Sequence, residues 1–320
     1  MLQVSFRNGN WLRWGVSSTS TSSLVNMDVS SQWLTSAGNS ATDDFLNQME
    51  QVVDQTLSLI DRFRHYIRDA ASVRPLSSPT LKNNLTLERD RGIEVIYAPF
   101  EHITHDARVV IVGITPGLVQ AENAIIAARS AIRNGMSDAD ALRHAKLTAS
   151  FSGRQTRYSL VSMMDAIGLQ QLLGVPSTDV LFSTAGEKVH FTSALRYPVF
   201  VDGKNYNGSP DMIRTPILRR MVESYLAEEV KTLPHAMWIP LGPKPAAALR
   251  HLAALGVLER QRILDGLPHP SGANAERIAC FLGRKPAHAA SLRTNPQKLA
   301  EARRALEAQV QRLIMKGASA

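Results

Sequence analysis

The sequence of 320 residues contains a single cysteine, Cys280, and lacks any long apolar run. One cysteine excludes a disulfide framework, a Cys-rich zinc site and an iron–sulfur cluster within one chain. It suits a reducing compartment, so we expect a cytoplasmic protein. No stretch is long enough to span a membrane, and the N-terminus lacks the apolar region of a signal peptide. We therefore expect no membrane partner.

Several common site motifs are also missing. The chain has no Gly-rich nucleotide loop of the form GxGxxG or GxxxxGK[ST], no GxSxG motif and no HExxH motif. His102 and His105 form a lone HxxH pair in a loop, a spacing that is usually incidental. We therefore expect neither a metal nor a cofactor.

The excess of positive charge lies entirely in the last quarter of the chain. The formal net charge is +8, and Pro243–Ala320 holds 13 Lys and Arg against 5 Asp and Glu. The rest of the chain holds 23 of each kind, so its balance is zero. A basic segment favours a polyanionic partner, usually nucleic acid. A solvated basic helix face is the alternative.

The chain is expected to have three parts. Residues 1–42 are rich in Ser and Thr and predict a flexible extension. Residues 43–91 predict an amphipathic helix over 43–70, because apolar residues recur at helical spacing, followed by a polar loop. Residues 92–320 predict an α/β domain whose last helix is basic and begins at Asn295, the N-cap, and Pro296.

Strands alternate with helices along the third part. This alternation predicts parallel strands with helices on both faces, and a ligand site beyond the carboxyl ends of the strands. The unusual sequences GITPG, TSALRYP, LGPKP and LPHPSGAN all stand at predicted strand ends. The predicted strands are 93–99, 109–114, 189–197, 236–241 and 263–267.

The stretch PHPSGAN, Pro268–Asn274, marks a junction from a strand to a helix. Free N–H groups and the dipole at the start of a helix suit a phosphate. Ser271 and the backbone of Gly272 are placed to hold it, and His269 stands where it reaches a developing anion. An ordinary helix cap is the alternative interpretation.

Two of these motifs together resemble the uracil-DNA glycosylase superfamily. VVIVGITPGL, residues 109–118, is similar to the GINPGL of its mismatch-specific branch, and LPHPSGAN is similar to its His-Pro-Ser motif. FTSALRYP, RYSLVSMMDAIGL and WIPLGPKPAAALRHL resemble the elements between them. The resemblance covers residues 92–285. It implies an α/β fold, a three-layer αβα sandwich with a short parallel sheet, to which residues 43–91 add an N-terminal helical extension.

The resemblance implies a DNA glycosylase, which flips a nucleotide out of the duplex and hydrolyses its N-glycosidic bond. His269 would stabilise the base as it leaves as an anion, and Ser271 would bind a backbone phosphate. The residues expected at the site are, by role, His269, Thr115 and Glu122 in catalysis; Ile114, Pro116, Phe151 and Ser193 in the base pocket; and Gly117, Lys244, Ser271, Gly272 and Asn274 on DNA phosphates.

The chain departs from the family pattern at several of these positions. Thr115 stands where other branches carry Asp or Asn to activate water; its hydroxyl can orient water but has no suitable pKa for a general base. Ile114 replaces a Glu, for which Glu122 is a candidate substitute. Ser193 stands where an Asn reads uracil, and Ala273 stands near a leucine that wedges into the base stack.

These departures favour a modified or bulky base over uracil. Hypermodified cytosine in viral DNA, such as glucosylated hydroxymethylcytosine in phage, is one such class, and its excision would be an antiviral defence. Three alternatives remain open. The protein is an ordinary uracil-DNA glycosylase in base excision repair, a catalytically silent DNA-binding relative, or an interaction module in which residues 1–70 bind a protein partner.

Overall fold

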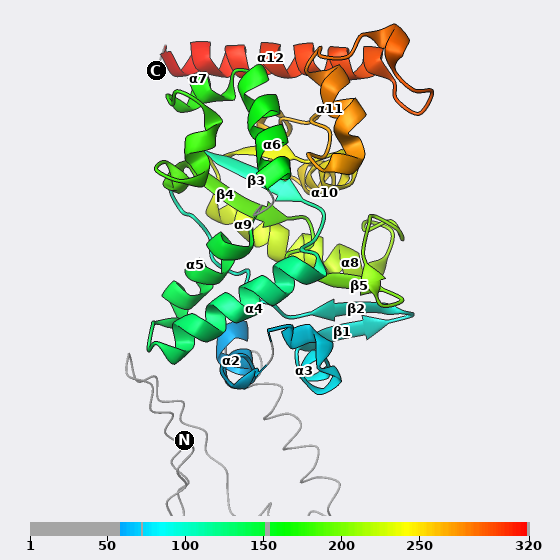
Figure 1. Cartoon of the computed structure of the whole chain (residues 1–320). Helices are drawn as coiled ribbons and strands as arrows, with labels where there is room; N and C mark the ends of the chain where they lie inside the picture. The colour runs from blue at the N-terminus through cyan, green and yellow to red at the C-terminus, as the bar shows by residue number, and fades with distance from the viewer. Residues whose placement is uncertain (1–57, 72, 151–153, 319–320) are drawn as a thin grey trace, which may run out of the picture. The chain divides into compact units, whose positions relative to one another are not determined.

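The computed structural model describes residues 58–71, 73–150 and 154–318 (Figure 1). The chain divides after Arg62 into two units, and the account below concerns the second, Phe63–Ala320. The expected extension 1–42 lies outside the described residues, as does most of the expected helix 43–70. The remainder of that helix is α2, Leu59–Asp69, which confirms the helical spacing of its apolar residues.

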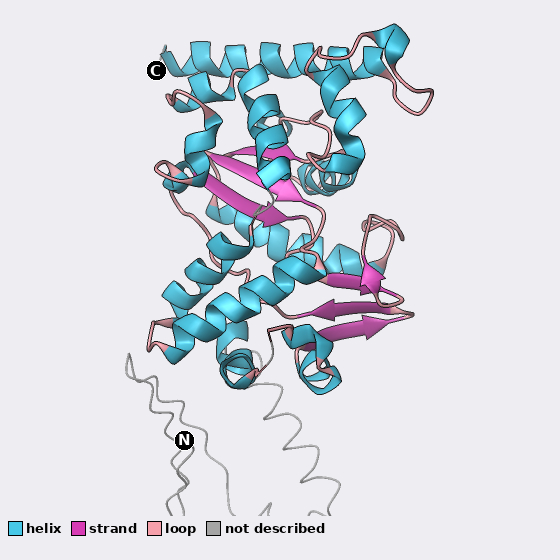
Figure 2. Cartoon of the chain, in the orientation of Figure 1, coloured by secondary structure: helices cyan, strands magenta, loops and turns pink. Residues whose placement is uncertain are grey.

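A parallel sheet of three strands ends in three of the four unusual sequences identified above, GITPG, TSALRYP and LGPKP (Figure 2). Its order is β4-β3-β7, and all five residues of β3 are buried, as expected for a strand covered on both faces. Gly113 at the end of β3 lies opposite Ser193 at the end of β4. The parallel pairing predicted from the alternating pattern is thus confirmed for β3, Val109–Gly113, β4, Val189–Ser193, and β7, Met237–Pro240.

One face of this sheet carries the main apolar core. Val109 and Ile111 of β3 pack there with buried residues of four helices. In Figure 1 the long helix α12 lies across α7 and α11, and all three contribute to this core. The N-cap predicted for α12 is confirmed, because Asn295 Oδ1 accepts a hydrogen bond from Lys298 N–H at 3.0 Å. The helices are α6, Arg154–Ala166, α7, Leu169–Leu173, α11, Ala275–Phe281, and α12, Pro296–Ala318.

The opposite face of the sheet contacts α5 and α9 through the buried side chain of His190. Helix α9 continues from α8 through a π turn, η4, Val222–Leu226. Helix α4 follows the GITPG turn and packs against α5. The helices are α4, Leu118–Arg133, α5, Asp138–Ala149, α8, Pro216–Met221, α9, Ala227–Thr232, and α10, Pro243–Ala254.

The strand predicted over 93–99 forms as β2, Ile93–Ile96, but it belongs to a second, antiparallel sheet that was not expected from the sequence. Its order is β1-β2-β5-β6, and its two hairpins turn at Arg91-Gly92 and Asp202-Gly203, where both residues have positive φ. Such turns match the natural twist of paired strands. The polar loop predicted over 71–90 is wrong, because it contains η1, Pro75–Ser77, α3, Pro79–Asn84, and β1. The strands are β1, Thr86–Asp90, β2, Ile93–Ile96, β5, Val199–Val201, and β6, Lys204–Asn205.

The strand predicted over 263–267 is also wrong. Only Ile263 forms an isolated parallel bridge, with Trp238, and Leu264 N–H donates to Trp238 O at 2.8 Å. The chain then leaves the sheet through Gly266, with φ of 139°, and Pro268, which has no N–H to donate. Across the described ranges, no helix combines the length and apolar character needed to cross a bilayer.

Candidate functional site

A cavity of about 370 Å³ lies at the carboxyl ends of the parallel strands. Its walls come from the GITPG turn after β3, the end of β4 and the loop that carries His269. The structure thus brings together two motifs that are more than 150 residues apart in the sequence. The predicted site residues that line the cavity are Ile114, Thr115, Pro116, Ser193 and His269.

His269 is held in one orientation by the turn that follows it. Its Nδ1 accepts a hydrogen bond from Ser271 N–H at 3.3 Å, so the neutral ring carries its proton on Nε2. Burial lowers the pKa of His269, which keeps the ring neutral at pH 7. The cavity is therefore lined by an uncharged imidazole, and Nε2–H is the single donor of this ring.

Thr115 lines the cavity, but its hydroxyl is already engaged. It donates to the carbonyl of Tyr197 at 3.0 Å and accepts from Val199 N–H at 3.2 Å. A hydroxyl has one proton, and that proton is used here. Thr115 thus joins the GITPG turn to the chain before β5, and it retains only acceptor capacity toward a water molecule.

Gly113 keeps space open at the end of β3. A Cβ at this position would lie 3.3 Å from Ser193 Oγ on the neighbouring strand, closer than ordinary van der Waals contact. Because both residues line the cavity, a side chain at residue 113 would crowd the Ser193 hydroxyl. The glycine therefore leaves Ser193 free to face a ligand.

The start of α4 is satisfied by side chains of the protein. Gly117 N–H donates to Gln120 Oε1 at 3.1 Å, and Leu118 N–H donates to Asn205 Oδ1 at 3.0 Å. These are two of the amides that a helix start would offer to an anion. A phosphate at Gly117, as expected from the sequence, would have to displace these partners.

The turn after His269 has a different hydrogen-bonding state. Ser271 Oγ accepts from Asn274 Nδ2 at 3.1 Å, and Asn274 Oδ1 accepts from Arg277 Nη1 at 3.2 Å. No hydrogen bond within the described chain engages the amide of Gly272 or Ala273. A Cβ at Gly272 would meet no atom within 4 Å, so this backbone is open to a ligand.

The other predicted site residues lie elsewhere. Glu122 is buried on α4 and does not line the cavity. Lys244 is half-buried at the start of α10, where its side chain lies against Gly208. Phe151 lies outside the described residues. The aromatic side chains that do line the cavity, Phe100, Phe191 and Tyr206, were not predicted.

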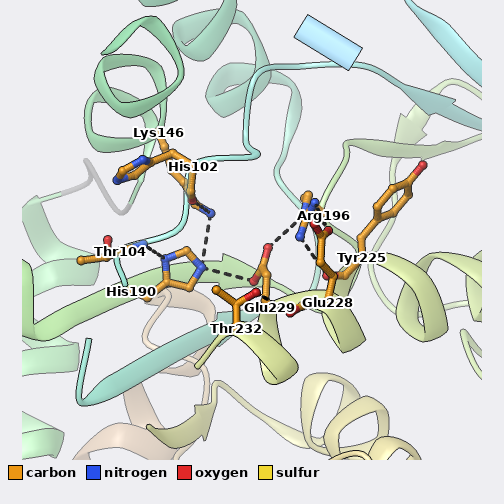
Figure 3. Close-up of polar contacts among 9 residues, drawn as sticks. All are labelled: His102, Thr104, Lys146, His190, Arg196, Tyr225, Glu228, Glu229 and Thr232. Atoms are coloured by element: carbon orange, nitrogen blue, oxygen red, sulfur yellow. Dashed lines mark hydrogen bonds and ion pairs between the residues drawn. The ribbon is translucent and has the colours of Figure 1, made fainter. Parts of the chain in front are cut away.

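A buried cluster of charges lies beside the cavity and was also missed (Figure 3). Glu229 on α9 is fully buried; its Oε1 accepts from Arg196 Nε at 2.8 Å, and its Oε2 lies 3.2 Å from His190 Nε2. Burial acts to raise the pKa of Glu229, but the charges of Lys146 and Arg196 and the hydrogen bond from His190 hold it well below the ordinary range.

Lys146 and Arg196 belong both to this cluster and to the cavity wall. They are 4% and 5% exposed. Burial lowers the pKa of Lys146 to about 8, so its ammonium group remains mostly charged at pH 7. Both carboxylate oxygens of nearby Glu101 are enclosed, and burial raises the pKa of Glu101 to about 7.

A second cavity, of about 510 Å³, shares Ser150 and Phe191 with the first. It is lined by both members of the HxxH pair, His102 and His105, and by Arg157, whose guanidinium lies 4.6 Å from the centre of the Phe182 ring. Among the residues that the structure describes, no group of three or more His, Cys, Asp or Glu side chains is placed to hold a metal ion.

The chain is similar to a protein of Bacillus subtilis. The uncharacterized protein YoxB of Bacillus subtilis strain 168 is 35% identical over 208 residues, which cover 64% of this chain and 80% of YoxB. No family model matches the chain. No solved structure matches it either.

Proposed function

The chain belongs to the family of Bacillus subtilis YoxB, and we propose that it is a DNA glycosylase that excises a modified base. The proposal rests on the resemblance of its GITPG and HPSGAN motifs to those of the uracil-DNA glycosylase superfamily. Its further support is that both motifs line one cavity at the ends of parallel strands. The reaction would require a flipped nucleotide, because the scissile bond is shielded in stacked duplex DNA.

The orientation and protonation of His269 supply the chemistry of the proposed reaction. During hydrolysis the bond between C1′ and the base nitrogen breaks and the base takes the electron pair; the water oxygen bonds to C1′, and the proton that this water loses passes through solvent to neutralise the departed base. A neutral imidazole that donates from Nε2 stabilises the departing anion as its charge develops. The hydrogen bond from Ser271 N–H to Nδ1 leaves His269 in this form.

The chemistry of Ser193 and the size of the cavity favour a modified base. A serine offers one rotatable hydroxyl, whereas an amide both donates to and accepts from uracil. The cavity of about 370 Å³ falls in the range of small-molecule sites. Hypermodified cytosine, such as glucosylated hydroxymethylcytosine of phage DNA, is the proposed substrate class. The proposed role is antiviral defence in the cytoplasm.

DNA contacts are assigned to the turn after His269. The open amides of Gly272 and Ala273 would bind a backbone phosphate together with Ser271. Arg277, an exposed residue in the first turn of α11, is held next to this turn by its hydrogen bond to Asn274 Oδ1. In the same proposal, the parallel sheet and the helices on its two faces form the αβα sandwich of the superfamily, and the basic last quarter of the chain binds the duplex electrostatically.

A base-release assay tests this function. The substrates are duplex DNA with uracil, single-stranded DNA with uracil, a T:G mismatch, and phage DNA with plain or glucosylated hydroxymethylcytosine, and abasic sites are detected by alkaline cleavage. We expect release from the modified phage DNA and its loss in His269→Ala. Robust release of uracil with none from modified cytosine would contradict the substrate assignment.

The engaged hydroxyl of Thr115 favours a second candidate, a silent relative that binds DNA. In this candidate no residue of the GITPG turn activates water, and the chain only recognises its target. DNA binding without release from any of these substrates would select this function over the first. Measuring duplex affinity in parallel with base release therefore separates the two.

A further inference from the structure

Lys146 is a buried cation that faces a cavity. It lies on α5, is 4% exposed, and lines the same cavity as His269. Removing a charged group from water is unfavourable unless hydrogen bonds and opposite charges compensate. The partners of Lys146 therefore show whether groups of the protein alone compensate the unfavourable free energy of burying its ammonium group.

The hydrogen-bond partners of Lys146 are fixed by the state of His190. His190 Nδ1 accepts from Thr104 N–H at 3.3 Å, so the neutral ring carries its proton on Nε2 and donates it to Glu229 (Figure 3). Burial and the charge of Lys146 lower the pKa of His190 to about 4, which keeps the ring neutral. The Nε2 atom that lies 3.4 Å from Lys146 Nζ is thus a donor and cannot accept from it.

Lys146 consequently has one acceptor in the described part of the chain. This acceptor is the carbonyl of His102, at 2.6 Å from Nζ. An ammonium group has three N–H donors, so two remain without a partner. Glu229 compensates part of the charge, but its oxygens are bonded to His190 and Arg196. Unpaired buried donors beside a cavity indicate a ligand that brings acceptors.

Arg196 adds a second positive charge to the same wall of the cavity. It is 5% exposed and binds Glu229, Glu228 and the carbonyl of Tyr225. Among the described residues near Lys146 and Arg196, Glu229 is a buried carboxylate whose pKa is held low, whereas Glu101 has a pKa raised by burial to about 7 and is therefore only partly charged at pH 7. This wall of the cavity therefore favours ligand groups with oxygen acceptors, and it should bind a negatively charged group more tightly than a neutral one.

We propose that Lys146, with Arg196 beside it, is a specificity-determining residue that binds an oxygen-bearing substituent of the base in the cavity. A carboxylate is held more tightly than a hydroxyl, and a methyl group gains nothing from these donors. This inference rests on the proposed function, because it takes the cavity as the base pocket. It specifies the substituent end of the pocket, whereas His269 acts on the bond that breaks.

Binding of free bases to the full chain tests the inference without requiring turnover. The probes are 5-carboxycytosine and 5-methylcytosine, titrated calorimetrically at pH 7. We expect the wild type to prefer the carboxylate at least about tenfold, the effect of one or two charge-assisted hydrogen bonds. In Lys146→Met this preference should fall to about twofold or less. Lys231→Met, which removes an exposed lysine of α9, is the matched control and should keep it.

Three results would overturn the inference: equal binding of the two bases by the wild type, no binding of either, or a preference that survives in Lys146→Met. Thermal melting first establishes that the variants fold. Lys146→Gln, which keeps a donor for the His102 carbonyl, replaces the methionine variant if the latter does not fold.

Base release from DNA, measured on the same samples, separates the inference from the proposed function. Selective binding of the free base without release from any substrate would keep the role of Lys146 and overturn the glycosylase. Release that is indifferent to the substituent on the base would keep the glycosylase and overturn the role of Lys146.

Discussion

The two turns that flank the cavity differ in what their polar groups do. In the GITPG turn, the Thr115 hydroxyl and the first amides of α4 are hydrogen-bonded within the protein. In the HPSGAN turn, the amides of Gly272 and Ala273 and Nε2 of His269 have no partner among the described residues. The polar groups of the first turn are satisfied within the protein, whereas the second turn leaves donors that are available for the proposed ligand.

This difference indicates that a motif at a strand end can either fix the shape of a pocket or supply polar groups to a ligand. Both turns hold glycine and proline at the same edge of one sheet, and sequence alone does not tell them apart. A satisfied turn is rigid and fixes the shape of the pocket, whereas an open turn supplies donors for chemistry and binding. Mutations in the two turns should therefore affect stability and function in opposite proportions.

The largest effect is expected at His269. His269→Ala removes the donor proposed to stabilise the leaving base and should reduce base release by about 10²–10³-fold, with little change in DNA affinity. Single-turnover cleavage and duplex binding measure the two quantities. His288→Ala, at an exposed position between α11 and α12, should behave as the wild type. An equal loss of release and affinity would show that His269 is a binding residue.

Thr115→Val should mainly cost stability. The valine leaves the Tyr197 carbonyl and Val199 N–H without a partner, so the free energy of unfolding should fall by roughly 1–3 kcal/mol. Urea unfolding measures this loss, with exposed Thr148→Val on α5 as the control. Below the melting range, base release should change less than about threefold. A hundredfold loss of release at unchanged stability would make Thr115 catalytic and abolish the distinction between the turns.

DNA affinity should respond to the open turn only. Ser271→Ala removes one proposed phosphate contact and should weaken duplex binding by about 3–10-fold. Gln120→Ala, which removes the partner of Gly117 N–H in the satisfied turn, should change affinity less than about twofold. Fluorescence anisotropy with an undamaged duplex measures both. The reverse order of the two effects would place the phosphate at the start of α4.

The smallest effect concerns pH. Burial lowers the folded-state pKa of His269, so below its ordinary pKa the unfolded chain binds a proton more readily than the folded chain. The wild type should therefore lose stability relative to His269→Ala as pH falls from 7 to 5. Thr115→Val changes no titratable group, so its stability difference should stay constant. If the wild type instead lost stability relative to His269→Ala as pH rises from 5 to 7, the ring would be charged in the folded state.

The sequence predicted the parts of the fold that depend on local pattern. The apolar run of β3, the α12 N-cap at Asn295 and the gathering of two motifs at one sheet edge follow from short-range chemistry. The antiparallel sheet was missed because its strands are short, although Asp202-Gly203 is a strong hairpin signal. Lys146 was missed because its surroundings come from distant segments, such as His102 and His190, which no local pattern connects.

The π turn in the helix that carries Glu229 determines the direction in which this side chain points from the helix axis. A π turn holds one residue more than an α turn, and each residue rotates an α-helix by about 100°. The side chains after Leu226 therefore point in a different direction from those of an uninterrupted helix. In this direction the Glu229 carboxylate contacts Arg196 and His190. Deleting one residue from Val222–Leu226 would preserve the helix but turn Glu229 aside. The extra residue thus acts as a spacer that aligns a distant negative charge with the cationic wall of the cavity.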